Sequence, residues 1–293
     1  MNITDARVRL PQDRRTSASY SAPARQTEQY DRVLGLTDKM NGGTLSGLLK
    51  EMDAVGISRA VMHAESEGGE DADALNTALR SVLDEHPDRF LGVGCVDVTL
   101  SSPTAIAAQA ARAQDLGLLG VSFQPAFFGL DIDDRRLYPL YSRAEEIGLV
   151  VAVHTGINYS RLHPIKHERA ENLDQVACDF PDLRLIACHA GWPWVTEFAA
   201  VARRHPTVFL EYGAIAPKYV ARPGTGWDVQ FAMMANVLRD QVLYGSDWPM
   251  ISPSRAVQEW RDSGLPDAAL EALLSRNAER LFGLEGGGVG LPT

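Results

Sequence analysis

The stretch "GLVVAVHTG" (148–156) is a short apolar run that ends in a polar residue and a glycine. Valine-rich runs of this length are typical of strands that are buried on both faces of a parallel sheet. A helical pattern follows over 170–180, and "LRLIACHAG" (183–191) then repeats the apolar run with its polar end. A strand, a helix and a second strand in this order predict a βαβ unit.

The same alternation extends along the whole chain. Six further apolar runs lie at 3–10, 57–65, 90–98, 118–126, 208–214 and 242–249. The other helical patterns cover 44–55, 71–86, 103–116, 134–147, 193–204, 228–240 and 252–263. No GxGxxG turn follows the first run, so eight strand–helix repeats favour an α/β fold of the (β/α)8 barrel type over an open, doubly wound sheet.

The repeats predict a single barrel domain over residues 1–284 and a flexible, glycine-rich tail over 285–293. The last helical run, 266–284, has apolar residues at helical spacing. We expect this extra helix to pack across the outside of the barrel or onto a partner subunit. The polar segment 12–43 lacks periodicity and is predicted to be a long loop on the catalytic face.

The composition restricts the possible partners and the location. The formal net charge of −10 speaks against binding to nucleic acid or to an anionic membrane surface. The first thirty residues hold no apolar block and no run of 18 apolar residues occurs, so we expect neither a signal peptide nor a membrane span. Three cysteines without CxxC spacing suit a reducing compartment. These features predict a cytoplasmic protein.

Polar residues end three of the apolar runs. They are His154, His189 and Asp247, and each is soon followed by a glycine or a proline that turns the chain. In a barrel of this kind the active site lies at the carboxyl ends of the strands. A single histidine there is more often structural, and a single aspartate is often a helix cap. Three such residues at three strand ends predict a shared functional site.

The first strand carries Arg7 and Arg9, which are two residues apart and therefore point the same way, with Asp5 in the same register. We expect these side chains to face the mouth of the barrel. An alternative is that either arginine only forms an internal salt bridge with Asp247.

Further candidates for substrate contact are Gln124 at the end of the fourth strand, Arg161 in the basic loop 158–169, and Trp192 after a motif turn. Each of them has a structural alternative: holding a loop, lying in solvent, or filling helix–strand packing. Of Glu211 and Tyr212 in the seventh strand, one must face inward, and alternation alone does not say which.

The motifs "VAVHTG", "LIACHAGWPW" and "LYGSDWP" resemble the amidohydrolase-related family over nearly the whole chain. This branch of the amidohydrolase superfamily includes aminocarboxymuconate-semialdehyde decarboxylase and aromatic-acid decarboxylases. The resemblance implies that a His-x-His pair on strand one holds a divalent metal, usually zinc, together with His154 of strand five and Asp247 of strand eight. It also implies that His189 of strand six acts as an acid or a base.

The chain departs from this pattern at strand one, where Arg7 and Arg9 stand in place of the two histidines. A guanidinium group is not deprotonated in proteins and therefore cannot ligate zinc. We predict that no metal cofactor is used. Zinc held by His154, His189 and Asp247 is the alternative.

The prediction is a metal-independent enzyme that acts on a small anionic unsaturated or aromatic carboxylic acid by decarboxylation or related lyase chemistry. Arg7 and Arg9 would hold a substrate carboxylate or a developing oxyanion. Asp247 and His189 would exchange a proton with the substrate, and His154 would donate a hydrogen bond to it.

One alternative is a hydrolase of an ester, lactone or amide, which would depend on metal if zinc is retained. A second alternative is a non-catalytic ligand-binding barrel. The resemblance also implies a homodimer.

Overall fold

The eight apolar runs form eight parallel strands, and each strand pairs with the next one along the chain. The computed structural model describes residues 2–15, 24–67 and 70–284. The strands are β1 (Ile3–Arg9), β2 (Ile57–His63), β3 (Phe90–Cys95), β4 (Gly120–Phe123), β5 (Val150–His154), β6 (Leu185–Cys188), β7 (Val208–Glu211) and β8 (Val242–Leu243). Hydrogen bonds from Ala6 N to Tyr244 O (2.8 Å) and from Arg9 N to Trp248 O (2.9 Å) join the segment after β8 to β1. The predicted (β/α)8 barrel is confirmed.

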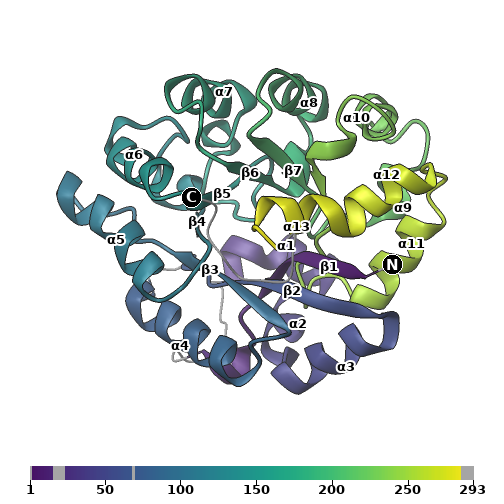
Figure 1. The fold of residues 1–293 in the computed structure, drawn as a ribbon, viewed down its shortest axis with the longest axis horizontal. Helices are drawn as coiled ribbons and strands as arrows, with labels where there is room; N and C mark the ends of the chain where they lie inside the picture. Colours follow the sequence, from purple (N-terminus) through teal and green to yellow (C-terminus); the bar gives the residue numbers. More distant parts are fainter. Residues whose placement is uncertain (1, 16–23, 68–69, 285–293) are drawn as a thin grey trace.

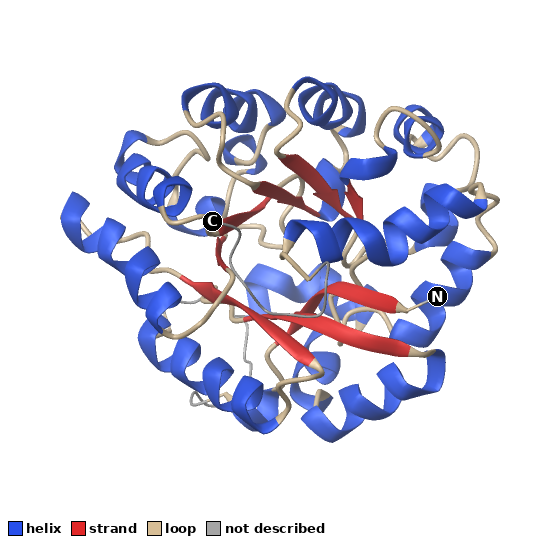
Figure 2. Cartoon of the chain, in the orientation of Figure 1, coloured by secondary structure: helices blue, strands red, loops and turns tan. Residues whose placement is uncertain are grey.

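Helices surround the strands, as Figure 1 and Figure 2 show. They are α1 (Ala24–Leu34), α2 (Leu36–Gly42), α3 (Leu45–Val55), α4 (Ala72–Glu85), α5 (Pro103–Asp115), α6 (Tyr138–Glu146), α7 (Ala170–Asp179), α8 (Val195–Arg204), α9 (Pro217–Val220), α10 (Asp228–Met234), α11 (Pro253–Arg261), α12 (Asp267–Glu271) and α13 (Asn277–Leu281). Side chains of Thr44, Asp71 and Ser102 accept backbone N–H groups at the starts of α3, α4 and α5. These caps satisfy donors that the first helical turn leaves unpaired.

Alternation along each strand divides the core into two layers. In β5, Val150 and Ala152 belong to a cluster inside the barrel, whereas Val151 and Val153 pack in the layer between strands and helices. Both faces of the strand are therefore buried, which explains its continuous apolar sequence. The next inward position is His154, so the alternation alone directs this histidine into the mouth of the barrel.

The sequence predicts that the C-terminal run packs across the outside of the barrel or onto a partner subunit, and in the structure this run crosses one end of the barrel. It forms α12, a π-helical turn (Ala272–Arg276) and α13. Ala278, Leu281 and Phe282 join the apolar cluster inside the barrel. Figure 1 shows α13 crossing the barrel end opposite to α1. The open end of the barrel leaves apolar side chains uncovered, and the apolar face of this helix buries them.

The segment after β1 is not a long loop, because it contains α1 and α2. Leu36 and Met40, one helical turn apart, are buried on α2. Two apolar positions are too few to give a detectable helical period, so the prediction was wrong here. The tail predicted over 285–293 lies outside the described residues. None of the described helices has the length and the hydropathy that a membrane crossing requires.

Candidate active site

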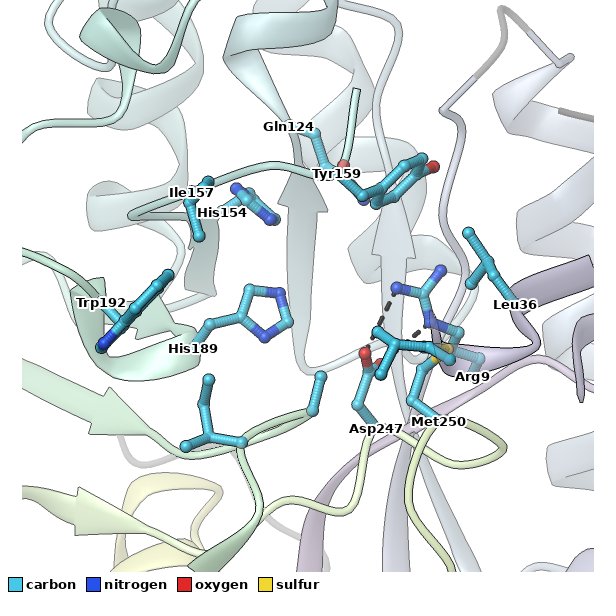
Figure 3. Close-up of a pocket in the computed structure, with 13 residues that line it drawn as sticks. Arg9, Leu36, Gln124, His154, Ile157, Tyr159, His189, Trp192, Asp247 and Met250 are labelled. Carbon is cyan, nitrogen blue, oxygen red and sulfur yellow. Dashed lines mark hydrogen bonds and ion pairs between the residues drawn. The ribbon is translucent and has the colours of Figure 1, made fainter. Parts of the chain in front are cut away.

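A cavity of about 230 Å³ lies at the carboxyl ends of the strands (Figure 3). Its lining residues are Arg9, Leu34, Leu36, Gln124, His154, Ile157, Tyr159, His189, Trp192, Ala214, Ile215, Asp247 and Met250. Six of the residues predicted from the sequence are among them. Two are not: Arg7 is buried and does not line the cavity, and Arg161 is exposed on the loop after β5. The other lining residues are largely apolar, which suits a small organic molecule with few polar groups.

The backbone is unusual where it presents two of these side chains. His189 and Asp247 adopt left-handed conformations, with φ of 64° and 51°. Non-glycine residues in this region are strained and persist where the surrounding structure holds them. The Asp247 N–H donates to the Arg7 carbonyl (2.8 Å), which helps to hold one of the two turns. Strain of this kind clusters at functional sites, which supports the assignment of this cavity.

The turn after His154 packs directly on the turn after His189. A Cβ atom on Gly156 would collide with the carbonyl oxygen of Trp192, and φ of Gly156 is +86°. Only glycine fits both the conformation and the space. As a result the two histidine rings lie close together, with centroids 4.7 Å apart and planes inclined by 59°.

Arg9 binds Asp247 through two of its nitrogens. Nε donates to Oδ1 (3.0 Å) and Nη2 donates to Oδ2 (3.2 Å). Nη1 donates to Glu67 Oε1 (2.7 Å) and lies 2.7 Å from Glu65 Oε2. Burial alone would lower the pKa of Arg9, but the charges of Asp247, Glu65 and Glu67 hold that pKa well above its ordinary value. Arg9 is therefore a permanent cation at the cavity wall.

Arg7 is 1% exposed and is enclosed by protein groups. Its Nε donates to Asp247 Oδ1 (3.1 Å), its Nη1 donates to Cys188 Sγ (3.2 Å), and its Nη2 donates to Glu65. The same guanidinium lies 3.4 Å from His63 Nδ1. Both arginines therefore pair with Asp247, and only Arg9 reaches the cavity.

The sequence interpretation missed the carboxylates that face these arginines. Glu65 is 4% exposed, and Arg7, Arg9 and Arg15 hold its pKa below the usual range although burial opposes this. Glu67 accepts from Gln124 Nε2 (3.0 Å) and from the hydroxyl of Tyr159. The position of Glu65 could have been predicted from the sequence. Glu65 lies two residues after His63, the last residue of β2, and strand alternation points both side chains the same way.

His189 is held as a neutral ring. Its Nδ1 lies 2.8 Å from Gly213 O, and because a carbonyl oxygen only accepts, Nδ1 carries the proton. Burial, and then the charges of His154 and Arg7, keep the pKa of His189 well below its ordinary value. Nε2 therefore has a lone pair that can accept a proton.

His154 faces a carboxylate that the sequence interpretation also missed. Its Nδ1 lies 2.9 Å from Oε1 of Glu168, and these side chains are 6% and 0% exposed. Neither Glu168 oxygen has a hydrogen-bond partner among the described residues. The His154 ring is therefore the basic side chain that lies beside this fully buried carboxylate.

In the seventh strand Glu211 faces inward and Tyr212 faces the helices. The Tyr212 hydroxyl donates to Gln230 Oε1 (2.8 Å). Glu211 accepts from the Gly213 N–H beside Arg7. Burial raises the pKa of Glu211 to about 8, although the charge of Arg7 opposes this.

One group of possible metal ligands occurs in the described part of the chain, away from this cavity. Asp174, Cys178 and His205 bring three donor atoms within 4.8 Å of one another. Arg204 already donates to both Asp174 oxygens (3.0 and 2.7 Å) and to Cys178 Sγ (3.6 Å). Two of the three possible ligands in this surface cluster are therefore already paired with Arg204.

The family model described as amidohydrolase matches residues 4–284, and the chain belongs to the amidohydrolase family. A 2-amino-3-carboxymuconate-6-semialdehyde decarboxylase from Dictyostelium discoideum is 29% identical over 83 residues, which span 28% of this chain and 23% of that protein. The predicted membership of the amidohydrolase family is confirmed by the family model, and the matched segment spans less than a quarter of the decarboxylase relative's own length.

Solved structures share the fold over almost the whole chain, and two examples show the range of similarity. An uncharacterised TIM-barrel protein from Bordetella bronchiseptica is 27% identical, with a TM-score of 0.77 and coverage of 97% of this chain and 99% of that one. A 5-carboxyvanillate decarboxylase from Novosphingobium aromaticivorans is 16% identical, with a TM-score of 0.68 and coverage of 96% of each chain. The latter was crystallised with manganese and 4-hydroxy-3-methoxy-5-nitrobenzoic acid.

Proposed function

We propose that this protein decarboxylates a small anionic aromatic or unsaturated acid that carries a hydroxyl group, and that it does so without a metal. The observation that carries the proposal is the pair of neighbouring histidines. One ring is neutral with a free Nε2, and the other faces a buried carboxylate. One ring can therefore accept a proton while the other donates a hydrogen bond.

The cavity wall supports an acid of this class. Ile157, Trp192, Ile215 and Met250 offer apolar surface to a flat ring. An apolar environment weakens the hydration of the carboxylate that leaves as carbon dioxide, and this favours loss of the charged group. The named decarboxylase relatives act on acids of the same general kind.

His189 moves the proton in the proposed reaction. Nε2 accepts the proton of the substrate hydroxyl and returns it to the ring carbon that bears the carboxylate. The carbon–carbon bond then breaks, its electron pair stays on the ring, and carbon dioxide leaves. His154 donates a hydrogen bond to the substrate oxygen throughout, and water reprotonates this oxygen in the product.

Arg9 provides the fixed positive charge at the cavity wall, near the carboxylate and the developing oxyanion. Arg7 acts on the reaction through Asp247 and Glu65, which it holds in place. Asp247 accepts N–H groups from both arginines on its two oxygens, so we assign it the task of orienting Arg9 rather than of carrying a proton.

The residues at the family's metal position do not suit a divalent cation. A catalytic zinc takes three protein ligands and a water molecule. Arg7 and Arg9 cannot be ligands, and both Asp247 oxygens already accept N–H groups from them. A divalent ion beside two guanidinium groups would also be repelled. We therefore derive no step that uses a metal.

A hydrolase of an ester or lactone is the second candidate, and the neutral ring of His189 is the observation that favours it. Nε2 can equally accept a proton from water, which would then attack a carbonyl carbon. Such a water is weaker than a metal-bound hydroxide, so an amide is the least suitable substrate.

A substrate screen under metal-free conditions tests the proposal. Protein treated with a chelator is incubated with a panel of hydroxybenzoates in deuterated water. We expect release of carbon dioxide and one deuterium at the carbon that lost the carboxylate. Turnover of aryl esters or lactones with ¹⁸O uptake from water, and no carbon dioxide from any acid, would favour the hydrolase.

The homodimer and the cytoplasmic location remain predictions. Light scattering on the purified protein tests the oligomeric state.

A further inference from the structure

A second, larger chamber of about 630 Å³ adjoins the catalytic cavity. The two spaces share the lining residues Leu34, Trp192, Ala214, Ile215 and Met250. The inner cavity and the outer chamber therefore lie on either side of the same few side chains.

The outer chamber is positively charged. Lys39, Lys218 and Arg255 line it, and no aspartate or glutamate of the described chain does. This distribution runs against the composition, because the chain has 38 acidic and 28 basic residues. A cavity lined by cations alone attracts anions even in a protein of negative net charge.

The side-chain ammonium groups of the two lysines contact no carboxylate of the described chain, although the backbone N–H of Lys218 donates to Glu259 Oε2 (3.1 Å). Lys39 Nζ donates to the carbonyl oxygen of Met250 (3.0 Å), and Lys218 Nζ lies 5.1 Å from the centre of the Tyr219 ring. Arg255 Nε donates to Glu259 Oε1 (2.7 Å), so its charge is already balanced. Lys39 and Lys218 are therefore the groups best placed to bind an anion.

Aromatic surface leads from the inner cavity to these lysines. Trp192 is 38% exposed and borders both spaces, and Tyr219 is 49% exposed. Side chains of this type bind the hydrocarbon part of a ligand while its polar end reaches a charge.

We propose that the outer chamber is a second substrate subsite, which binds an anionic group at the far end of an elongated substrate. The reacting carboxylate lies in the inner cavity, so the inference rests on the proposed function. The substrate class is then an aromatic or unsaturated acid with a side chain that ends in a carboxylate or a phosphate.

Calorimetric titration with synthetic acids tests this inference. The probes are benzoate and a series of 4-(carboxyalkyl)benzoates of increasing chain length. Each has a matched probe whose terminal carboxylate is replaced by a carboxamide, which keeps the length and removes the charge. Terminal phosphonates form a third series and distinguish the two kinds of anion.

At the optimal length we expect the terminal carboxylate or phosphonate to bind at least about tenfold more tightly than the carboxamide. The double variant Lys39→Met/Lys218→Met is expected to abolish this preference and to leave the affinity for benzoate unchanged. Lys50→Met, on the exposed face of α3, is the control and should keep the preference. Thermal unfolding of each variant checks that it is folded.

Two results distinguish failure of the outer subsite from failure of the proposed function. In the first result, benzoate binds, but the probes that end in a carboxylate, a phosphonate or a carboxamide bind with equal affinity at every chain length. This result would overturn the outer subsite and leave the proposed function standing. Absence of binding by benzoate and all its derivatives would contradict the proposed function, and the subsite with it.

Discussion

Arg9 and Asp247 form a two-point contact at the cavity wall, with Nε to Oδ1 at 3.0 Å and Nη2 to Oδ2 at 3.2 Å. A planar guanidinium matches a carboxylate in this arrangement, and a lysine ammonium does not. The contact fixes the direction in which Arg9 presents its charge to a bound acid. Four predictions test this arrangement and the groups around it.

Replacement of Arg9 tests whether the geometry of the charge matters. We expect Arg9→Lys to lower kcat/KM by about 100-fold, because a single ammonium cannot hold Asp247 at two points and Glu67 as well. Initial rates of carbon dioxide release measure the effect. Arg136→Lys, at an exposed ion pair with Asp134, is the matched control and should keep the wild-type rate.

Replacement of Arg7 tests the stability of the buried network. Arg7→Met would leave Asp247 and Glu65 buried without one of their cations, which costs about 3–5 kcal/mol in the free energy of unfolding. Denaturant unfolding measures this cost. A variant as stable as the wild type would show that the network contributes nothing to the folded state.

Replacement of His189 tests proton transfer. We expect His189→Ala to lower kcat by about 10²–10⁴-fold, because the group that moves the proton is lost. The truncated ring leaves space beside Gly213, so added imidazole should restore part of the rate. Wild-type turnover in this variant would exclude His189 as the proton carrier.

The sequence predicted the barrel and six of the residues that line the cavity, and for three of them the reason can be stated. His154 follows from strand alternation, and His189 and Asp247 follow from their places at strand ends. The sequence did not predict that Arg9 lines the cavity while Arg7 is buried behind it. The register of β1 shifts between Asp5 and Val8, so simple alternation does not hold there.

Glu168 was beyond the reach of pattern analysis for a different reason. It lies in a loop, where neither period nor strand register fixes the direction of a side chain. Only the path of the chain from β5 to α7 brings its carboxylate to His154.

The buried carboxyl group of Glu211 gives a pH-dependent prediction. Burial raises its pKa to about 8 in the folded protein, above its value in the unfolded chain. Between these two pKa values the folded state holds a proton that the unfolded state has lost, so the contribution of Glu211 to stability falls as pH rises. Glu211→Gln should therefore stabilise the protein at pH above about 8 and have little effect near pH 5. Thermal unfolding at the two pH values measures the difference, and an equal shift at both would contradict the raised pKa.

The most direct test of the central claim measures decarboxylation with and without metal. The protein is purified without chelator, analysed for metal, stripped, and assayed on the acid that it turns over, before and after addition of manganese or zinc. We expect less than about a tenth of an equivalent of metal, no loss of activity on stripping and no gain on addition. Activity that disappears with the chelator and returns with either ion would contradict the replacement of the metal by Arg7 and Arg9.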